Sequence, residues 1–257
     1  MSDGSQRAKA KQVHARPPAA LHLLTVLLTV ATGAMDAICF LELGDVFASV
    51  MTGNVVLLGL AAGNADGALA VHTGVALASF GVATLLGSLT AGRHRAPSGR
   101  RVWPARTTAA FAVEATALSV FLLLWILRGP EIAGAEELVL LALAAFAMGT
   151  QSAVVNQLDV PGGSTTYITG TLTRLLSGTI TRLVTGGQGG WVERWAAARL
   201  AALIAGAAGA ALLVATASSM APVLPLALLT VVIVVALLPI VRADAPPAPK
   251  TGDGARR

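Results

Sequence analysis

The sequence predicts an all-helical bundle that crosses a membrane several times, with six full transmembrane helices and two short helical segments that carry a Thr-Gly motif. Two observations lead to this prediction. Apolar residues make up 55% of the chain and charged residues only 12%, whereas soluble domains are about a quarter charged. The charges also gather at the two ends and in a few connections, so long apolar runs lie between them. A helix needs about 20 apolar residues to cross the hydrocarbon core, and several runs reach that length.

The runs that are predicted to form full spans are residues 20–41, 68–91, 107–127, 138–157, 195–217 and 222–241. Two shorter segments follow the first and fourth runs, at residues 46–62 and 168–184. Their motifs read Met51-Thr52-Gly53-Asn54 and Thr169-Gly170-Thr171. We predict that these segments enter the membrane partway and return. The first run is longer than the apolar part of a secretory signal, which has about 7 to 15 residues, and is expected to be retained as a helix.

Positive charge sets the expected orientation, because connections rich in Lys and Arg stay in the cytoplasm. The basic segments are the amino-terminal tail, residues 93–106, residues 168–195 and the carboxyl-terminal tail. Six spans place all of them on one side, which predicts that both termini are cytoplasmic. If both Thr-Gly segments crossed fully, residues 93–106 would lie outside, against this rule, so eight crossings remain the alternative. Residues 1–19 and 242–257, rich in Ala, Pro, Gly and charge, are predicted to be disordered tails.

The two halves of the chain present the same features in the same order, which indicates an internal repeat. Residues 20–128 and 137–241 each read as a long helix, a Thr-Gly segment and two further long helices. Each half holds three full spans, an odd number, so the second copy would be inverted in the bilayer. Inverted repeats with partial helices near the midplane are typical of secondary transporters. The alternative is that helices rich in Ala, Leu and Gly look alike by chance.

Four motifs carry a resemblance to a known family. They are Gly33-x-x-Asp36-Ala37, Phe47-x-x-x-Met51-Thr52-Gly53-Asn54, Gly149-x-Gln151-x-Ala153 and Thr169-Gly170-Thr171. With these motifs, over about residues 21–240, the chain resembles the YoaK-like family of bacterial membrane proteins, domain of unknown function 1275. The resemblance implies a bacterial inner-membrane protein, and it supplies neither a substrate nor an activity.

Two carboxylates lie inside predicted spans, where ionisable groups are costly and usually face the bundle interior or an aqueous cavity. Asp36 lies in the last part of the first span. It could bind a cation or exchange a proton, or it could cap the following turn through backbone N–H groups. Glu114 lies inside the third span between apolar residues. It could be a proton-coupled site, or its side chain could extend towards Arg106 at the nearby interface.

Amide and hydroxyl groups complete the predicted substrate site. Gln151 ends the fourth span and faces Asp36 in the repeat scheme, although an amide can equally well link two helices. The Thr-Gly segments add Thr52, Gly53 and Asn54 in the first half and Thr169, Gly170 and Thr171 in the second. Glycine lets a helix open, and the freed peptide groups could line a cavity. A tight helix crossing through Gly53 or Gly170 is the structural alternative.

Other classes of function are disfavoured. The basic residues flank apolar spans instead of clustering with aromatic residues on a folded face, so nucleic-acid binding is not expected. His22 and His72 have no partner at metal-ligand spacing, and no serine has a Gly-x-Ser-x-Gly context. We therefore expect no metal, no cofactor and no catalytic activity. Cys39 is the only cysteine and is expected to be a small buried hydrophobic residue.

The leading hypothesis is a small secondary transporter or permease for a polar or weakly charged solute, with the lipid bilayer and that solute as partners. Asp36 and Glu114 are its candidates for proton or ion coupling. The rivals are a non-transporting scaffold, whose polar residues would face helix contacts, and a membrane-embedded enzyme. Small residues at four-residue spacing predict close helix packing and permit a homo-oligomer. They are Ala83, Gly87 and Ala91 in one helix and Ala198, Ala202, Gly206 and Ala210 in another.

Overall fold

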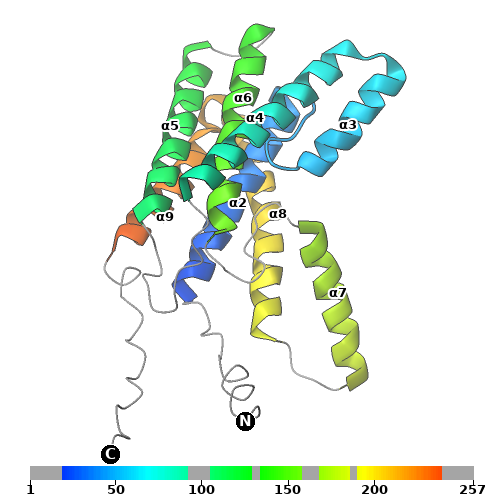
Figure 1. Cartoon of the computed structure of the whole chain (residues 1–257), viewed down its shortest axis with the longest axis vertical. Helices are drawn as coiled ribbons and strands as arrows, with labels where there is room; N and C mark the ends of the chain where they lie inside the picture. Colours follow the sequence, from blue (N-terminus) through cyan, green and yellow to red (C-terminus); the bar gives the residue numbers. More distant parts are fainter. Residues whose placement is uncertain (1–18, 92–104, 129–133, 158–167, 186–189, 239–257) are drawn as a thin grey trace, which may run out of the picture.

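The computed structural model describes residues 19–91, 105–128, 134–157, 168–185 and 190–238. These residues form α-helices, one 3-10 turn and short connections, and they contain no strand. The helices are α2 (Ala19–Glu42), α3 (Met51–Asn64), α4 (Gly67–Ala91), α5 (Ala105–Arg128), α6 (Ala135–Val155), α7 (Ile168–Thr185), α8 (Trp191–Ala217), η1 (Ser218–Met220) and α9 (Val223–Leu237). The predicted all-helical class agrees with this architecture (Figure 1).

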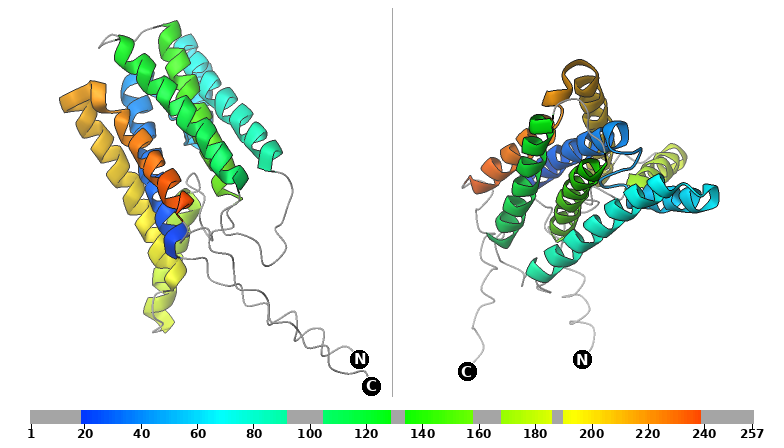
Figure 2. Two further views of the ribbon diagram at one scale, coloured as in Figure 1. Left: turned by 90° about the vertical axis from the view of Figure 1, so that its left-hand side faces the viewer. Right: turned by 90° about the horizontal axis from the view of Figure 1, so that it is seen from above.

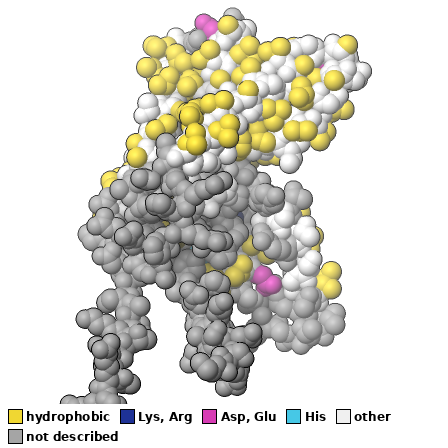
Figure 3. Space-filling model, in the orientation of Figure 1, with side chains coloured by type: hydrophobic (Ala, Val, Ile, Leu, Met, Phe, Trp, Pro, Cys, Tyr) yellow, Lys and Arg dark blue, Asp and Glu magenta, His cyan; other side chains and the backbone are white. Residues whose placement is uncertain are grey.

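Five helices within the described residues are long and apolar enough to cross a membrane. They cover Ala19–Glu42, Gly67–Leu89, Thr107–Leu127, Ala135–Val155 and Trp191–Met220. The sixth predicted span, residues 222–241, contains the 15-residue helix α9, and its residues 239–241 lie outside the described part of the chain. Large hydrophobic side chains remain exposed on the helices, such as Leu85 and Leu89 at 67% and 77%. Hydrophobic side chains are spread over the described surface in Figure 3, and lipid would cover them.

The long helices alternate in direction. α2, α5 and α8 run one way through the bundle, and α4, α6 and α9 run the other way (Figures 1 and 2). Contacts at the helix ends agree. His72 Nε2 near the start of α4 lies 3.2 Å from Glu137 Oε1 at the start of α6, and Gln157 Nε2, beyond the end of α6, donates to the Gly87 carbonyl near the end of α4 at 3.5 Å. The N-termini of α2, α5 and α8 and the C-termini of α4 and α9 therefore share one end of the bundle.

The main helix pairs join the first half of the chain to the second. α2 lies along α8 and also contacts α9, whereas α6 lies along α4 and also contacts α5. In the pairs α2–α8 and α4–α6 the two helices run parallel. The shorter helices pack within their own halves, α3 on α4 and α7 on α8.

Glycine lets α2 and α8 approach until their backbones touch. A Cβ atom on Gly33 would overlap the carbonyl oxygen of Leu203, and a Cβ atom on Gly206 would overlap the carbonyl oxygen of Val30. Each helix thus presents a glycine to a carbonyl group of the other, the close approach that small residues permit in membranes. Ala210 on the same face of α8 is fully buried. The predicted small-residue face of this helix is therefore a packing face.

The α4–α6 pair has the same kind of crossing. A Cβ atom on Gly149 would meet the backbone of Phe80, and a Cβ atom on Gly87 would lie 2.7 Å from the Cβ of Ala153. The Thr84 hydroxyl donates to the Gly149 carbonyl at 3.3 Å across the crossing. The small residue predicted to pack in α4, Gly87, takes part in this contact.

Between α2 and α3 the chain is not helical, which corrects the predicted helical segment at residues 46–62. Residues 43–50 turn back along α2, and α3 begins only at Met51. The turn uses left-handed backbone at Gly44 (φ 80°) and Asp45 (φ 56°), a conformation that terminates helices. With 14 residues and about 1.5 Å of rise for each, α3 is too short to cross the hydrocarbon core by itself.

The two shorter helices point to opposite ends of the bundle. α3 leads from its buried start towards the end where α4 begins, and α7 leads towards the end where α8 begins (Figure 1). Asn54 in the first turn of α3 is fully buried, whereas Ala65 just beyond its last turn is exposed. Asn54 and Ala61 are the buried residues of α3, so the same side of this helix faces the bundle near its start and near its end.

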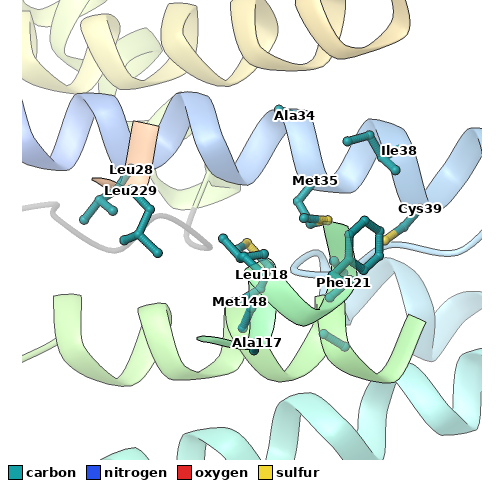
Figure 4. Close-up of a cluster of buried hydrophobic side chains, with 14 of the residues drawn as sticks. Leu28, Ala34, Met35, Ile38, Cys39, Ala117, Leu118, Phe121, Met148 and Leu229 are labelled. Atoms are coloured by element: carbon teal, nitrogen blue, oxygen red, sulfur yellow. The ribbon is translucent and has the colours of Figure 1, made fainter. Parts of the chain in front are cut away.

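A hydrophobic core between α2, α5, α6 and α9 fills the centre of the bundle (Figure 4). Leu28 of α2 lies near Leu229 of α9, and Leu118 of α5 lies near Met148 of α6. Cys39 of α2 belongs to the same cluster and is fully buried. The expectation that this cysteine is a small core residue is confirmed.

Candidate functional site

Asp36 holds the non-helical segment between α2 and α3. One carboxylate oxygen accepts the backbone N–H of Ser49 at 2.7 Å, and the other accepts the Ser49 hydroxyl at 2.6 Å. Asp36 is 6% exposed and Ser49 is 2% exposed, so water does not compete for these bonds. Of the two roles considered for Asp36, binding backbone N–H groups beyond the helix is the one that the structure contains.

Asn54 fastens the same segment from the side of α3. Its amide oxygen accepts the Phe47 N–H at 3.0 Å, and its amide nitrogen donates to the Phe47 carbonyl at 2.7 Å. One side-chain amide therefore satisfies both polar groups of one residue outside regular secondary structure, as buried backbone requires. Asp36 and Asn54 together fix residues 43–50 against the bundle.

Gln151 links the two halves of the chain. Its side-chain nitrogen donates to the Thr32 hydroxyl of α2 at 2.7 Å and approaches the Leu28 carbonyl at 3.4 Å. Its side-chain oxygen is buried and has no hydrogen-bond partner in the part of the chain that the structure describes. Gln151 thus meets α2 about one turn before Asp36, rather than at Asp36 as the repeat scheme suggests.

Glu114 is the most secluded carboxylate of the described helices. Its side chain is fully buried, and neither carboxylate oxygen has a hydrogen-bond partner among the described residues. The alternative of a side chain extended towards Arg106 involves a side chain outside the described residues. A buried carboxylate without a donor is strongly unfavourable in its charged form, so this group calls for a proton or another cation.

The Thr-Gly residues do not converge on one chamber. Thr52 is exposed on the first turn of α3, and a Cβ atom on Gly53 would lie 3.3 Å from the nearest side chains. In α7, Thr171 is 3% exposed and Gly170 is half-buried. Thr169 belongs to α7, but its side chain lies outside the described part. The predicted site residues therefore lie in several places. Asp36 and Asn54 bind residues 43–50, Gln151 contacts α2, and α7 packs on α8.

A further polar cluster, which was not predicted from the sequence, lies at the N-terminal ends of α2 and α8. Arg199 is 2% exposed. Its guanidinium donates to His22 Nδ1 at 2.9 Å and to the Thr25 hydroxyl at 3.3 Å. The His22 ring stacks on Trp195 with centroids 4.9 Å apart and meets Trp191 edge-on at 4.6 Å. An Arg within an apolar span is a functional signal by itself, and it could have been read directly from the sequence.

A groove of about 410 Å³ lies between α4 and α6. Its lining is almost wholly apolar and includes Val82, Leu143 and Phe146. Such a lining suits a hydrocarbon chain better than a polar solute, so we do not count this groove with the polar groups above.

Comparison with known proteins decides the family. The profile of a family described as "Protein of unknown function (DUF1275)" matches residues 24–236, which run from α2 into α9. The chain belongs to the DUF1275 family. The match extends over both halves of the bundle and includes the packing glycines, Asp36, Asn54, Glu114, Gln151 and Arg199, whereas His22 lies just before it.

One curated relative of this DUF1275 protein is the UPF0700 transmembrane protein YoaK of Bacillus subtilis (strain 168). The two are 36% identical over 149 residues, which cover 58% of this chain and 63% of the relative. The match thus spans less than two thirds of the relative's length. No solved structure matches the chain. A transmembrane relative and five apolar helices of spanning length make this DUF1275 protein a multi-pass membrane protein.

Proposed function

We propose that this protein is a secondary transporter or permease for a small polar or weakly charged solute, placed in the inner membrane with both termini in the cytoplasm. The observation that supports this most is that the packing scheme is unchanged when the two halves are exchanged. Under that exchange α2 on α8 becomes α6 on α4, α2 on α9 becomes α6 on α5, and α3 on α4 becomes α7 on α8, and all six pairs are in contact. Transporters built from two repeats have this property.

The directions of the helices favour an inverted relation between the halves. α2 and α6 run in opposite directions, and so do α4 and α8, and α5 and α9 (Figure 2). A parallel repeat would keep each pair in the same direction. In inverted-repeat transporters the two halves rock against each other around a central site.

α3 and α7 provide the proposed place for the solute. A helix N-terminus carries free N–H groups and the positive end of the helix dipole. In transporters such ends face polar groups of the substrate near the bilayer midplane. The proposed path runs between the starts of α3 and α7, next to the Thr-Gly motifs.

Ion coupling is assigned to Glu114. Its carboxylate is buried and forms no hydrogen bond with the described residues, so it can gain or lose a proton without first releasing one of them. Both oxygens of Asp36 are occupied by Ser49, which makes Asp36 the weaker of the two candidates.

Cysteine accessibility tests the inverted arrangement. In a Cys39→Ser background, single cysteines replace Asp66 in the α3–α4 turn and Gly190 before α8, which hold corresponding places in the two halves. We expect a membrane-impermeant thiol reagent to label the Asp66 position from outside and the Gly190 position only in permeabilised cells. Labelling of both positions from the same side would contradict an inverted repeat. Ser98 and Ser219 serve as reference positions for the cytoplasmic and outer sides.

Flux into liposomes tests transport itself. The purified protein is reconstituted with an internal pH-sensitive dye and exposed to amino acids, sugars, nucleobases, monocarboxylates and amines. With at least one of these classes of solute, we expect protons to cross the membrane at ten or more times the rate seen in liposomes without the protein. Glu114→Gln should abolish this movement, and Glu137→Gln, at a partly exposed carboxylate of α6, should leave it intact. If the folded wild-type protein exchanges none of these solutes, the transporter proposal fails.

A scaffold without transport is the second candidate, and one observation favours it. Asp36, Asn54 and Gln151 all bond within the chain, as expected for polar groups that only connect helices. The flux experiment separates the two candidates, because a scaffold moves no solute.

A further inference from the structure

Glu114, Gln151 and Thr32 reach the core from three different helices at one level of the bundle. Leu118 of α5 lies near Met148 of α6 in Figure 4. α5 and α6 are antiparallel neighbours, so one turn back from Leu118 and one turn on from Met148 lead to the same depth. Those steps arrive at Glu114 and Gln151. Gln151 in turn contacts Thr32 of α2.

Hydrogen-bond acceptors are in excess at this level. Both Glu114 oxygens and Gln151 Oε1 are buried and have no donor among the described residues. The donors are directed elsewhere: Gln151 Nε2 donates to Thr32 Oγ1 at 2.7 Å, and Thr32 Oγ1 donates to the Leu28 carbonyl at 2.9 Å. Buried polar atoms of native proteins normally have a partner. A single proton on Glu114 would supply the missing donor.

We propose that Glu114, Gln151 and Thr32 form a proton-dependent relay, in which protonated Glu114 donates to Gln151 Oε1 and loss of that proton reverses the hydrogen bonds. The inference rests on the proposed function, because it identifies the site of the coupling proton. The carboxylic acid O–H bond breaks, the proton leaves to water on one side, and the carboxylate keeps the electron pair. No other reactant is needed.

The reversal follows from the chemistry of a carboxamide. A half-turn about the Cγ–Cδ bond of Gln151 exchanges its oxygen and its nitrogen. The nitrogen then donates to the Glu114 carboxylate, and the Thr32 hydroxyl swings from the Leu28 carbonyl to Gln151 Oε1. The hydroxyl can do so because it is both donor and acceptor. Proton loss from Glu114 in α5 thereby changes the hydrogen bond between Gln151 of α6 and Thr32 of α2. That bond joins the second half of the chain to the first.

The charged groups of the surrounding helices lie at other levels. α9 contains no titratable residue, and α6 carries only Glu136 and Glu137, in its first turn. α2 carries His22 near its start, and Asp36, Cys39 and Glu42 beyond Thr32, with Asp36 bonded to Ser49. α4 contacts α5 less extensively. Its His72 lies near the start of α4, next to Glu137 at the start of α6. Glu114 is therefore the titratable group at this level of the described helices.

Infrared difference spectroscopy tests the relay without a known solute. The purified full chain in lipid is taken between acidic and alkaline buffer, and the carbonyl band of a protonated carboxylic acid is followed. Wild-type protein should show such a band, and Glu114→Gln should remove it. Gln151→Met should shift it to higher wavenumber, because the acid loses its acceptor. Thr32→Val should alter the amide band of Gln151. Glu137→Gln is the matched carboxylate control and should leave the Glu114 band unchanged.

The outcomes separate this inference from the proposed function. A Glu114 band that does not respond to Gln151→Met, or no such band at all, overturns the relay even if solute flux is found. A band with the expected response supports the relay even if no solute is transported. Gln151→Asn takes the place of Gln151→Met if the methionine variant does not fold. It keeps an amide but shortens the side chain, so the Glu114 band should again shift to higher wavenumber.

Discussion

Replacing Gly206 by valine is expected to lower the free energy of unfolding by about 3 kcal/mol or more, at or above the top of the usual range for overpacked cores. The added side chain would overlap the Val30 carbonyl oxygen, and that oxygen belongs to a helix backbone that cannot rotate away. α2 and α8 would have to separate along their whole contact. Unfolding in increasing SDS, followed by tryptophan fluorescence, measures the loss.

Gly81→Val is the matched control. Gly81 is also in an apolar helix, but a Cβ atom on it would meet no atom within 4 Å. Valine has a slightly better helix propensity than glycine, so this variant should be as stable as the wild type or slightly more stable. Equal stability of the Gly206 and Gly81 variants would show that the α2–α8 crossing is not tight.

Asp36→Ala should release the segment of residues 43–50 and cost about 2 to 6 kcal/mol. The substitution leaves the N–H and the hydroxyl of Ser49 buried without acceptors, and each such group costs about 1 to 3 kcal/mol. Ser49→Ala removes only the hydroxyl bond and should cost about half as much. Amide hydrogen exchange measures the effect directly, because exchange at Ser49 should become faster in the Asp36 variant.

A matched acidic control lies nearby. Asp66 accepts the Leu69 N–H at 3.0 Å in an exposed turn, so Asp66→Ala should cost only about 1 kcal/mol, the usual loss for a helix cap. If Asp36→Ala leaves exchange at Ser49 as slow as in the wild type, residues 43–50 are held by packing instead of by the carboxylate.

Most long helices were predictable because each corresponds to a long apolar run in the sequence. Such a run can be recognised from local composition alone. The predicted span at residues 20–41 is α2, Ala19–Glu42, and the span at residues 68–91 is α4, Gly67–Ala91. The start of α3 was not predictable in this way. Its position depends on two left-handed residues, Gly44 and Asp45, and on a side-chain bond from Asp36, which is distant in sequence.

The candidate site was predictable in its residue types and not in their partners. Gln151 and Glu114 were singled out because polar groups in apolar spans are rare. That Gln151 meets Thr32 follows only from the docking of α6 on α2. Arg199 carried the same signal as Glu114, but its place near the start of a span made it resemble the basic residues that flank helices.

The pairing of α2 with α8 also constrains how the protein is made. About 150 residues separate the end of α2 from the start of α8, its main partner, and contacts between segments so far apart form slowly. During synthesis Gly33 and the polar groups of α2 therefore enter the membrane before α8 is made, without their final neighbours. We expect lipid, the insertion machinery or a membrane chaperone to cover this face of α2 until α8 is inserted.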